Sequence, residues 1–187
     1  MKQKIIKNNF FKNNPEFVAK NLLGKVIVRK IKNREIKILI LETEAYLGEN
    51  DLASHAHFGK TERNKAMFED GGIWYVYLVY GIHWLLNIVT EKQDKPSAVL
   101  IRRGLSLNKT KKILNGPAIV ARTLKIDGKF YGKKSLRESG LWIEDWGIDL
   151  KKIKIRKLTR VGVDYAGRWA DKKLRFNLDN LEELAIF

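Results

Sequence analysis

The chain is 187 residues long and 44% hydrophobic, which suits one folded domain with a substantial core. Its 37 Lys and Arg against 21 Asp and Glu give a formal charge of +16, which favours a polyanionic partner, nucleic acid before membrane. Lys, Asn and Ile are abundant along the whole chain, so a general compositional bias is the alternative explanation for part of this charge, in place of a binding surface. The absence of cysteine excludes disulfides, thiolate nucleophiles and cysteine-bound zinc.

The sequence carries no pattern of a secretory or membrane-spanning segment. The start, "MKQKIIKNNFFKNNPEF", lacks a continuous apolar run before a cleavage site. The longest apolar stretch, "LVYGIHWLLNIV", is interrupted by Gly81, His83 and Asn87 and is too short to span a bilayer. Because the sequence contains no repeat and no linker, we predict a single domain over residues 1–187. We also predict that the protein is cytoplasmic and has no membrane partner.

The first predicted elements are a short helix and a β-hairpin. "PEFVAKNLLGK" has apolar residues at helical spacing and a stop at Gly24. "KVIVRKI" and "EIKILILETEAY" are β-rich and separated by a polar turn, which predicts a hairpin. Strict alternation along the second strand places Glu44 and Tyr46 on the same face as Ile38 and Ile40.

The rest of the chain predicts further strands and two more helices. Thr61 is a candidate cap for a short helix that ends near Gly71. "IWYVYLVYGIHWLLNIVT" and "SAVLIRRG" predict strands, with a tight turn at Tyr80-Gly81. Pro117 suits the first turn of a helix, and the tail mixes short strands with turns at Gly162 and Gly167. The pattern indicates a mixed α+β domain around an antiparallel sheet.

Residues 42–57, "ETEAYLGENDLASHAH", contain four carboxylates and two of the three histidines. A carboxylate that continues an apolar strand face is costly unless it has partners, so Glu44 is either hydrogen-bonded structure or a positioned base. A divalent metal site is the alternative use of these residue types, although the spacing matches no established ligand motif. A solvated polar turn is the third interpretation.

A run of aromatic residues follows, and most of its members are expected to pack in the core. Tyr80 differs because it stands beside Gly81 at the predicted turn. An exposed aromatic ring at a hairpin tip of a basic protein suggests a wedge or stacking platform for nucleic acid.

Several blocks taken together resemble a known family. "ETEAYLGENDLASHA", "TERNKAMF", "WYVYLVYGIHWLLN", "AVLIRRG", "NGPAIVARTL" and "TRVGVDYAGRWADKKLRF" occur in the order found in the alkyladenine (3-methyladenine) DNA glycosylase family. The resemblance implies an α+β domain with a curved antiparallel β-sheet core, peripheral helices and a protruding β-hairpin. It also implies a monofunctional enzyme of base-excision repair that flips damaged purines out of duplex DNA and hydrolyses the N-glycosidic bond.

The resemblance carries site roles onto matching positions. Glu44 matches the base that activates water, and Arg102 matches a residue that helps to hold that water, with the backbone at Val161 as a third contact. The remaining matched positions form the base pocket or contact DNA: Tyr46, His55, Tyr77 and Asn87 in the pocket, and Tyr80 and Met67 at the DNA.

The resemblance further implies a monomer that acts on double-stranded DNA containing 3-methyladenine, 7-methylguanine or hypoxanthine, with no metal and no organic cofactor. Glu62 and Arg103 depart from the family pattern, and the stretch after Gly104 is shorter than in many relatives, which leaves substrate range and DNA footprint open. Two rival functions remain: a non-catalytic nucleic-acid-binding module, and a metal-dependent hydrolase that uses the carboxylates and histidines of residues 42–57.

Overall fold

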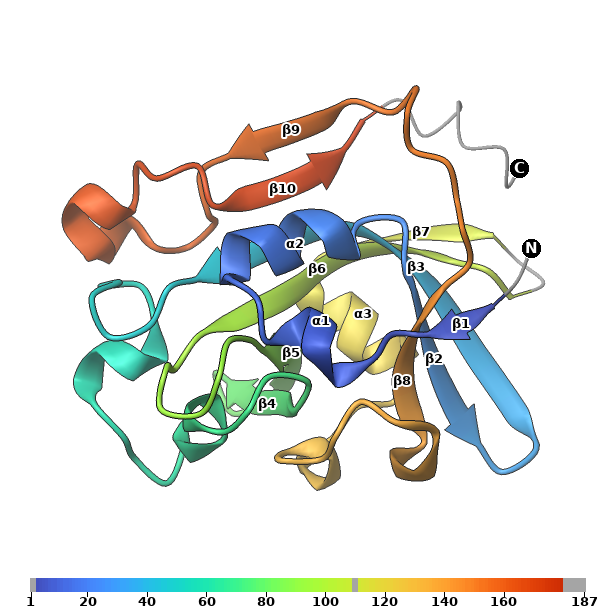
Figure 1. Cartoon of the computed structure of the whole chain (residues 1–187), viewed down its shortest axis with the longest axis horizontal. Coiled ribbons are helices and arrows are strands. Elements are labelled where there is room, and N and C mark those ends of the chain that lie inside the picture. The colour runs from blue at the N-terminus through green and yellow to red at the C-terminus, as the bar shows by residue number, and fades with distance from the viewer. Residues whose placement is uncertain (1–2, 109–110, 180–187) are drawn as a thin grey trace.

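A computed structural model describes residues 3–108 and 111–179 of the chain (Figure 1). Within these ranges the strands are β1 Lys4–Ile5, β2 Val26–Ile31, β3 Arg34–Tyr46, β4 Trp74–Val79, β5 His83–Val89, β6 Ala98–Ser106, β7 Lys112–Asn115, β8 Leu141–Asp145, β9 Ile155–Leu158 and β10 Arg175–Leu178. The α-helices of the same ranges are α1 Asn8–Phe11, α2 Pro15–Leu22 and α3 Pro117–Thr123. The limits of the predicted domain, residues 1 and 187, lie outside the described residues.

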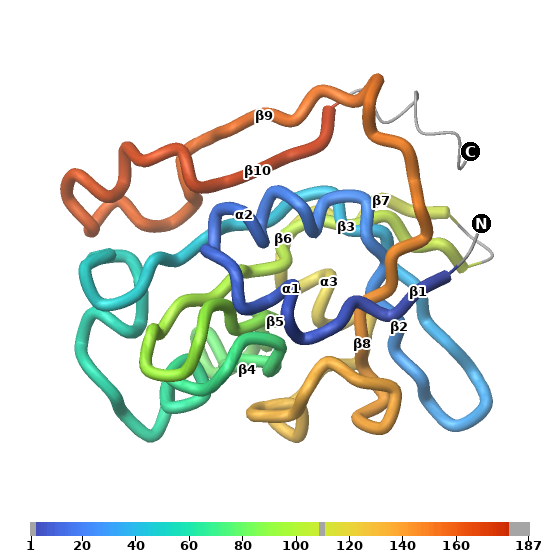
Figure 2. Tube along the Cα trace, viewed as in Figure 1, coloured from blue at the N-terminus to red at the C-terminus, as the bar shows by residue number. Residues whose placement is uncertain are grey.

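All strand pairings that the structure describes are antiparallel, and the strands form one strongly curled sheet. The order along its main path is β1-β8-β2-β3-β6-β5-β4, while β7 pairs with β6 and the β9–β10 ribbon joins through β3. Figure 2 follows the chain through this curl, with the ribbon lying along one side of α2. The predicted α+β class, with its curved antiparallel sheet and peripheral helices, is confirmed.

The hairpin of β2 and β3 forms as predicted, with a turn at Lys32, whose φ is 52°. From Ile38 to Ala45 every residue of β3 is buried, because other elements cover both faces of the strand. On one face the Thr43 hydroxyl donates to the Ala19 carbonyl of α2 at 2.8 Å. Burial on both faces explains why this strand reads as a nearly continuous apolar run.

The pairing of β3 with β6 contains two shifts in register, between Ile40 and Thr43 of β3. The two shifts cancel, because the pairing has the same register at Ile40 and at Thr43, so the irregularity is local. The hydrogen bond from the Tyr46 hydroxyl to Glu44 agrees with the predicted shared face of these two residues. The two strands also approach closely: a Cβ at Gly104 would lie 2.3 Å from the Cγ2 atom of Ile38. Any residue other than glycine at position 104 would therefore require Ile38 to move.

The hairpin of β4 and β5 turns at Tyr80 and Gly81, whose φ values are 52° and 70°, as the sequence predicts. Its protrusion from the body of the protein stays a prediction. The helix expected after Thr61 is shorter than predicted, a 3₁₀ helix over Lys65–Phe68. The Asn64 side chain before it donates to the carbonyls of His55 and Gly59, which ties this segment to the preceding loop.

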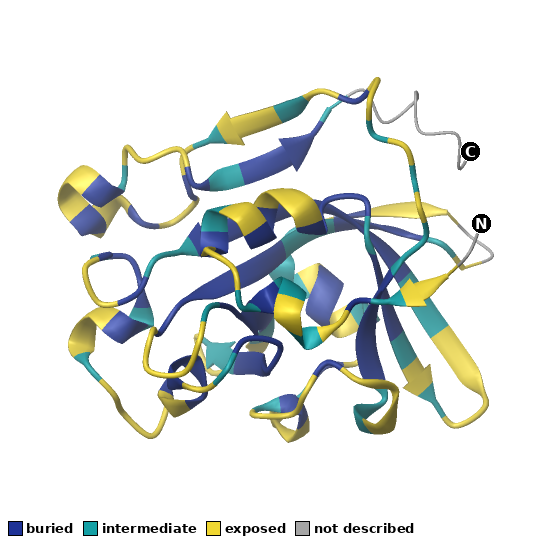
Figure 3. Cartoon of the chain, viewed as in Figure 1, coloured by how far each residue is buried: buried dark blue, intermediate teal, exposed yellow. Residues whose placement is uncertain are grey.

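The principal core lies between the sheet and helices α2 and α3, and Figure 3 shows buried residues concentrated along the central strands. A second, smaller cluster packs beside β4 and includes Ala56, Met67, Phe68 and Tyr75. This cluster supports one wall of the cavity described below. None of the described helices has the length and apolar character needed to cross a membrane.

Candidate active site

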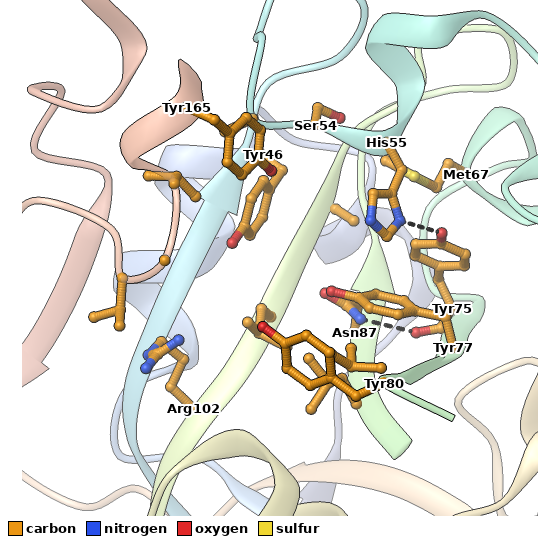
Figure 4. A pocket seen from close by; sticks show the side chains of 18 residues that line it. Tyr46, Ser54, His55, Met67, Tyr75, Tyr77, Tyr80, Asn87, Arg102 and Tyr165 are labelled. Atoms are coloured by element: carbon orange, nitrogen blue, oxygen red, sulfur yellow. Dashed lines mark hydrogen bonds between the residues drawn. The ribbon is translucent and has the colours of Figure 1, made fainter. Parts of the chain in front are cut away.

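A cavity of about 270 Å³ opens between β3, the β4–β5 hairpin, β6 and the loops around residues 54 and 162 (Figure 4). Its size, near the lower end for ligand pockets, suits a small planar group rather than a whole nucleotide. The lining is largely aromatic and apolar with a few polar groups: Tyr46, Ala53, Ser54, His55, Met67, Tyr75, Tyr77, Val79, Tyr80, Leu85, Asn87, Ala98, Leu100, Arg102, Val161, Gly162, Val163 and Tyr165.

The Glu44 carboxylate lies directly behind this lining, and the residue has 0% of its surface exposed. The backbone N–H of Val161 donates to Oε1 at 2.8 Å, and the Tyr46 hydroxyl donates to Oε2 at 2.9 Å. Arg102 is a further donor, with Nη1 3.4 Å from Oε2. All three partners line the cavity, so they fix the carboxylate directly behind the cavity wall.

Two opposing effects act on the pKa of Glu44. Burial raises it above the ordinary carboxyl value, while Arg102, the Val161 N–H, the Tyr46 hydroxyl and Arg175 lower it, and burial outweighs them. Arg102 therefore favours the ionised form of Glu44, but the net pKa shift is upward. Such a carboxylate is a stronger proton acceptor than an exposed one.

Tyr46 is held from behind by a buried ion pair. The Arg160 guanidinium lies 4.8 Å from the centre of the Tyr46 ring, and its nitrogens donate to both oxygens of Asp51 at 2.5 and 2.8 Å. The Asp51 carboxylate also accepts hydrogen bonds from the backbone N–H groups of Leu47 and Ala53. This pair fixes the loop after β3, and with it the ring that forms one side of the cavity.

His55, Tyr75 and Tyr77 form an aromatic wall across the cavity. The His55 and Tyr77 ring centres are 4.6 Å apart, and the His55 Nδ1 atom lies 2.7 Å from the Tyr75 hydroxyl oxygen. Burial, helped by the charge of Arg63, lowers the pKa of His55 to about 4, so the ring is neutral near pH 7. Burial likewise raises the pKa of Tyr77 to about 12, so its hydroxyl stays protonated.

Asn87 and Met67 lie deeper, and Tyr80 lies at the rim. The Asn87 side-chain amide donates to the Tyr75 carbonyl at 3.1 Å, which fixes its orientation on β5. Met67 is only 1% exposed and packs in the small cluster beside the cavity, so its predicted contact with DNA stays a prediction. Tyr80 is 90% exposed, as expected for a ring at the tip of a hairpin.

The structure separates the side chains that the metal interpretation grouped together. Asp51 turns to Arg160, the His55 ring to Tyr75, and the exposed His57 ring to the Glu49 carbonyl. Over residues 3–108 and 111–179, no three His, Asp or Glu side chains gather in the way that a metal site requires. The site residues brought together are Glu44, Tyr46, His55, Tyr77, Asn87 and Arg102, with Tyr80 at the entrance.

Sequence reasoning missed four contributors to this site. Arg160 and Arg175 are distant in sequence and lie in a tail that reads as a set of short basic strands. Tyr75 was grouped with the core aromatics, and Tyr165, 71% exposed, stands in a turn-rich stretch without any strong pattern. The one available signal was that Arg160 and Val161 are adjacent in the quoted motif "TRVGVDYAGRW".

Comparison with known proteins identifies the family. The model for the methylpurine-DNA glycosylase (MPG) family matches residues 9–182. The chain belongs to the methylpurine-DNA glycosylase family. The family expected from the sequence motifs is therefore confirmed, and with it the expected class of enzyme, a hydrolase that acts on N-glycosyl bonds.

Bacterial and archaeal relatives align along almost the whole methylpurine-DNA glycosylase chain. A Clostridium beijerinckii protein is 37% identical, covering 94% of this chain and 96% of its own. One from Psychrobacter cryohalolentis is 35% identical, covering 92% and 91%, and one from Methanocella arvoryzae is 41% identical, covering 85% and 84%. Each is named as a candidate 3-methyladenine DNA glycosylase.

Proposed function

We propose that this methylpurine-DNA glycosylase releases alkylated or deaminated purines, namely 3-methyladenine, 7-methylguanine and hypoxanthine, from double-stranded DNA by a water molecule that Glu44 activates. The observation that carries the proposal is the buried Glu44 carboxylate directly behind the wall of an aromatic cavity, held by the lining residues Val161, Tyr46 and Arg102. The protein acts as a monomer and needs neither a metal nor an organic cofactor.

Glu44 supplies both negative charge and a proton acceptor. As the bond between the purine and C1′ breaks, its electrons leave with the base and positive charge builds on the sugar. Water adds to C1′ and gives its proton to Glu44, which leaves an abasic site and the free base. The upward pKa shift of Glu44 supports the second role, and its hydrogen bonds with Arg102 and Val161 fix the carboxylate against the cavity wall.

The aromatic lining suits an extruded purine. Tyr46 on one side and His55 with Tyr77 on the other offer flat surfaces for stacking. A 3- or 7-alkylated purine is cationic, so it is attracted to electron-rich ring faces and is already a good leaving group. Because His55 is neutral near pH 7, it adds no repulsion against that charge.

Asn87 and Tyr80 supply selectivity and access. The Asn87 amide is locked by its bond to the Tyr75 carbonyl, so a normal guanine would crowd it with the 2-amino group. Extrusion of a base costs a few kcal/mol of stacking and pairing. The exposed Tyr80 ring offsets part of this cost by filling the vacated place in the duplex.

The decisive experiment compares wild type with Glu44→Gln on a duplex that carries one hypoxanthine and on DNA treated with a methylating agent, both in EDTA. We expect wild type to produce abasic sites, scored by alkaline strand cleavage, and Glu44→Gln to be at least about 100-fold slower. The exposed Glu138, which does not line the cavity, provides the matched control: Glu138→Gln should match wild type.

Equal release by wild type and Glu44→Gln would contradict the role of Glu44. Activity that EDTA abolishes and added metal restores would instead favour the metal-dependent hydrolase. Tight DNA binding without base release from any substrate would favour the non-catalytic module. Release from methylated DNA but not from the hypoxanthine duplex would narrow the substrate range and leave the mechanism standing.

A further inference from the structure

A second buried carboxylate, Glu42, lies two residues before Glu44 on β3. It faces Arg103 of β6 and Asn177 of β10 in the strand register, and only 8% of its surface is exposed. A buried carboxylate is costly unless charged partners compensate it, so its partners indicate what it does.

Three guanidinium groups surround the Glu42 carboxylate. Arg102 Nε donates to Oε1 at 3.1 Å, and Arg175 Nη1 donates to the same oxygen at 3.3 Å. Arg103 Nη1 lies 4.0 Å from Oε2 and donates to the Asn177 side chain at 2.7 Å. The cluster thus contains three positive charges and, with Glu44, two negative charges.

The contacts of Arg102 divide unequally between the two carboxylates. The bond from Nε to Glu42 is the shortest, at 3.1 Å, whereas both contacts with Glu44 are 3.4 Å long. Arg102 also falls at the register shift of β6, between the partners of Glu42 and Thr43. Shifts of this kind re-aim a side chain, so the orientation of Arg102 depends on its partner as well as on the strand.

We propose that Glu42 is a positioning residue for base release. It holds the Arg102 guanidinium between the two carboxylates and thereby limits how strongly the positive charge of Arg102 acts on Glu44. Arg175 holds Glu42 in turn, through the same oxygen that accepts from Arg102. This inference rests on the proposed function, because it assigns a task within the reaction that Glu44 and Arg102 perform.

The electrostatic consequence has a definite sign. Glu44 is faced by Arg102 of β6, Arg175 of β10, Tyr46 of its own strand, Tyr77 of β4 and the Val161 N–H. Removing the charge of Glu42 takes away a neighbouring negative charge and frees Arg102 to turn to Glu44, and both changes lower the Glu44 pKa. Removing the charge of Arg175 has the opposite effect, since it takes away a cation and leaves Glu42 less compensated.

The test measures single-turnover release of 7-methylguanine between pH 4.5 and 8.5, because this cationic base needs no proton to leave. In Glu42→Gln we expect the acid limb of the profile to move to lower pH by about one unit and the plateau rate to fall roughly tenfold. In Arg175→Gln we expect the acid limb to move to higher pH. Glu138→Gln, the exposed control, should follow wild type.

Opposite displacements of the two acid limbs would support the proposal, because general damage to the fold does not move them in opposite directions. Circular dichroism and thermal unfolding check that each variant is folded. If Glu42→Gln does not fold, the displacement of the acid limb in Arg175→Gln tests the inference by itself. A Glu42→Gln profile that matches wild type, or one with a lower plateau but an unmoved limb, would overturn the inference. Absence of release by wild type would instead overturn the proposed function.

Discussion

His55 is a histidine that its surroundings keep uncharged. Burial is the main cause of its lowered pKa, about 4, and the nearby Arg63 is the second. The unfolded chain has the ordinary value near 6.5, so it takes up a proton between pH 6.5 and 4 that the folded protein does not. The stabilising contribution of this residue is therefore fully present above pH 6.5 and is lost as the pH falls.

We predict that NMR titration of the histidine ring protons will give a midpoint near pH 4 for one ring, and that this resonance will be missing in His55→Gln. The linked loss of unfolding free energy between pH 7 and pH 4.5 should be at most about 3 kcal/mol, measured by urea denaturation. His55→Gln should lose correspondingly less over the same interval. A His55 midpoint near 6.5 would contradict the neutral ring.

The β4–β5 hairpin combines a buried base with an exposed tip. Its first residues, from Trp74 to Val76, pack into the core, while Tyr80 and Ile82 at the turn are largely exposed. The left-handed backbone at Tyr80 is uncommon for a residue other than glycine and costs on the order of 1 kcal/mol. An exposed ring kept at a strained turn contributes little to folding, which supports its proposed contact with DNA.

We predict that Tyr80→Ala will leave the melting temperature within a few degrees of wild type but will weaken binding to lesion-containing duplex, whereas Tyr80→Phe will retain it. Because an unpaired base costs less to extrude, the defect in base release should shrink when the lesion is mispaired. Gel-shift and single-turnover assays on matched and mismatched duplexes measure this difference. Unfolding of Tyr80→Ala would instead show that the ring belongs to the core.

The buried pair of Asp51 and Arg160 joins parts of the fold that are more than a hundred residues apart. Besides Asp51, Arg160 binds the carbonyls of Ala45 at the end of β3 and of Trp169 in the tail. One guanidinium therefore fastens the connection between β9 and β10 to the end of β3 and to the loop that follows it. Breaking a buried pair on one side leaves an uncompensated charge, which costs far more than breaking an exposed pair.

We predict that Asp51→Asn will lower the unfolding free energy by about 3 kcal/mol or more and will reduce base release by loosening Tyr46. Asp70 forms a partly exposed pair with Lys12 at 2.7 Å, so Asp70→Asn is the matched control and should lower the unfolding free energy far less than Asp51→Asn does. Chemical denaturation of the three proteins gives the comparison. Equal losses in both variants would contradict a special role for the buried pair.

Local patterns predicted the secondary structure well where one physical signal dominated. The helix at Pro15–Leu22, the β2–β3 hairpin and the turn at Tyr80-Gly81 follow from periodicity, a polar turn and glycine. The helix after Thr61 was overpredicted, because Asn64 bonds to carbonyls in the preceding loop. The local irregularity between Ile40 and Thr43 was not predicted, since pairing with β6 rather than local preference determines it.

The sequence by itself determined the family and the fold class, because several long motifs occur together in one order. It also named many of the side chains that the structure places around the cavity. Only the tertiary structure decided how the charges around Glu44 are shared. Arg160, Arg175 and Glu42 act through partners from other strands and loops, with separations of up to 133 residues, which no local pattern records. Burial raises the pKa of Glu44 while Arg102 and Arg175 lower it, and these effects arise only when the chain is folded.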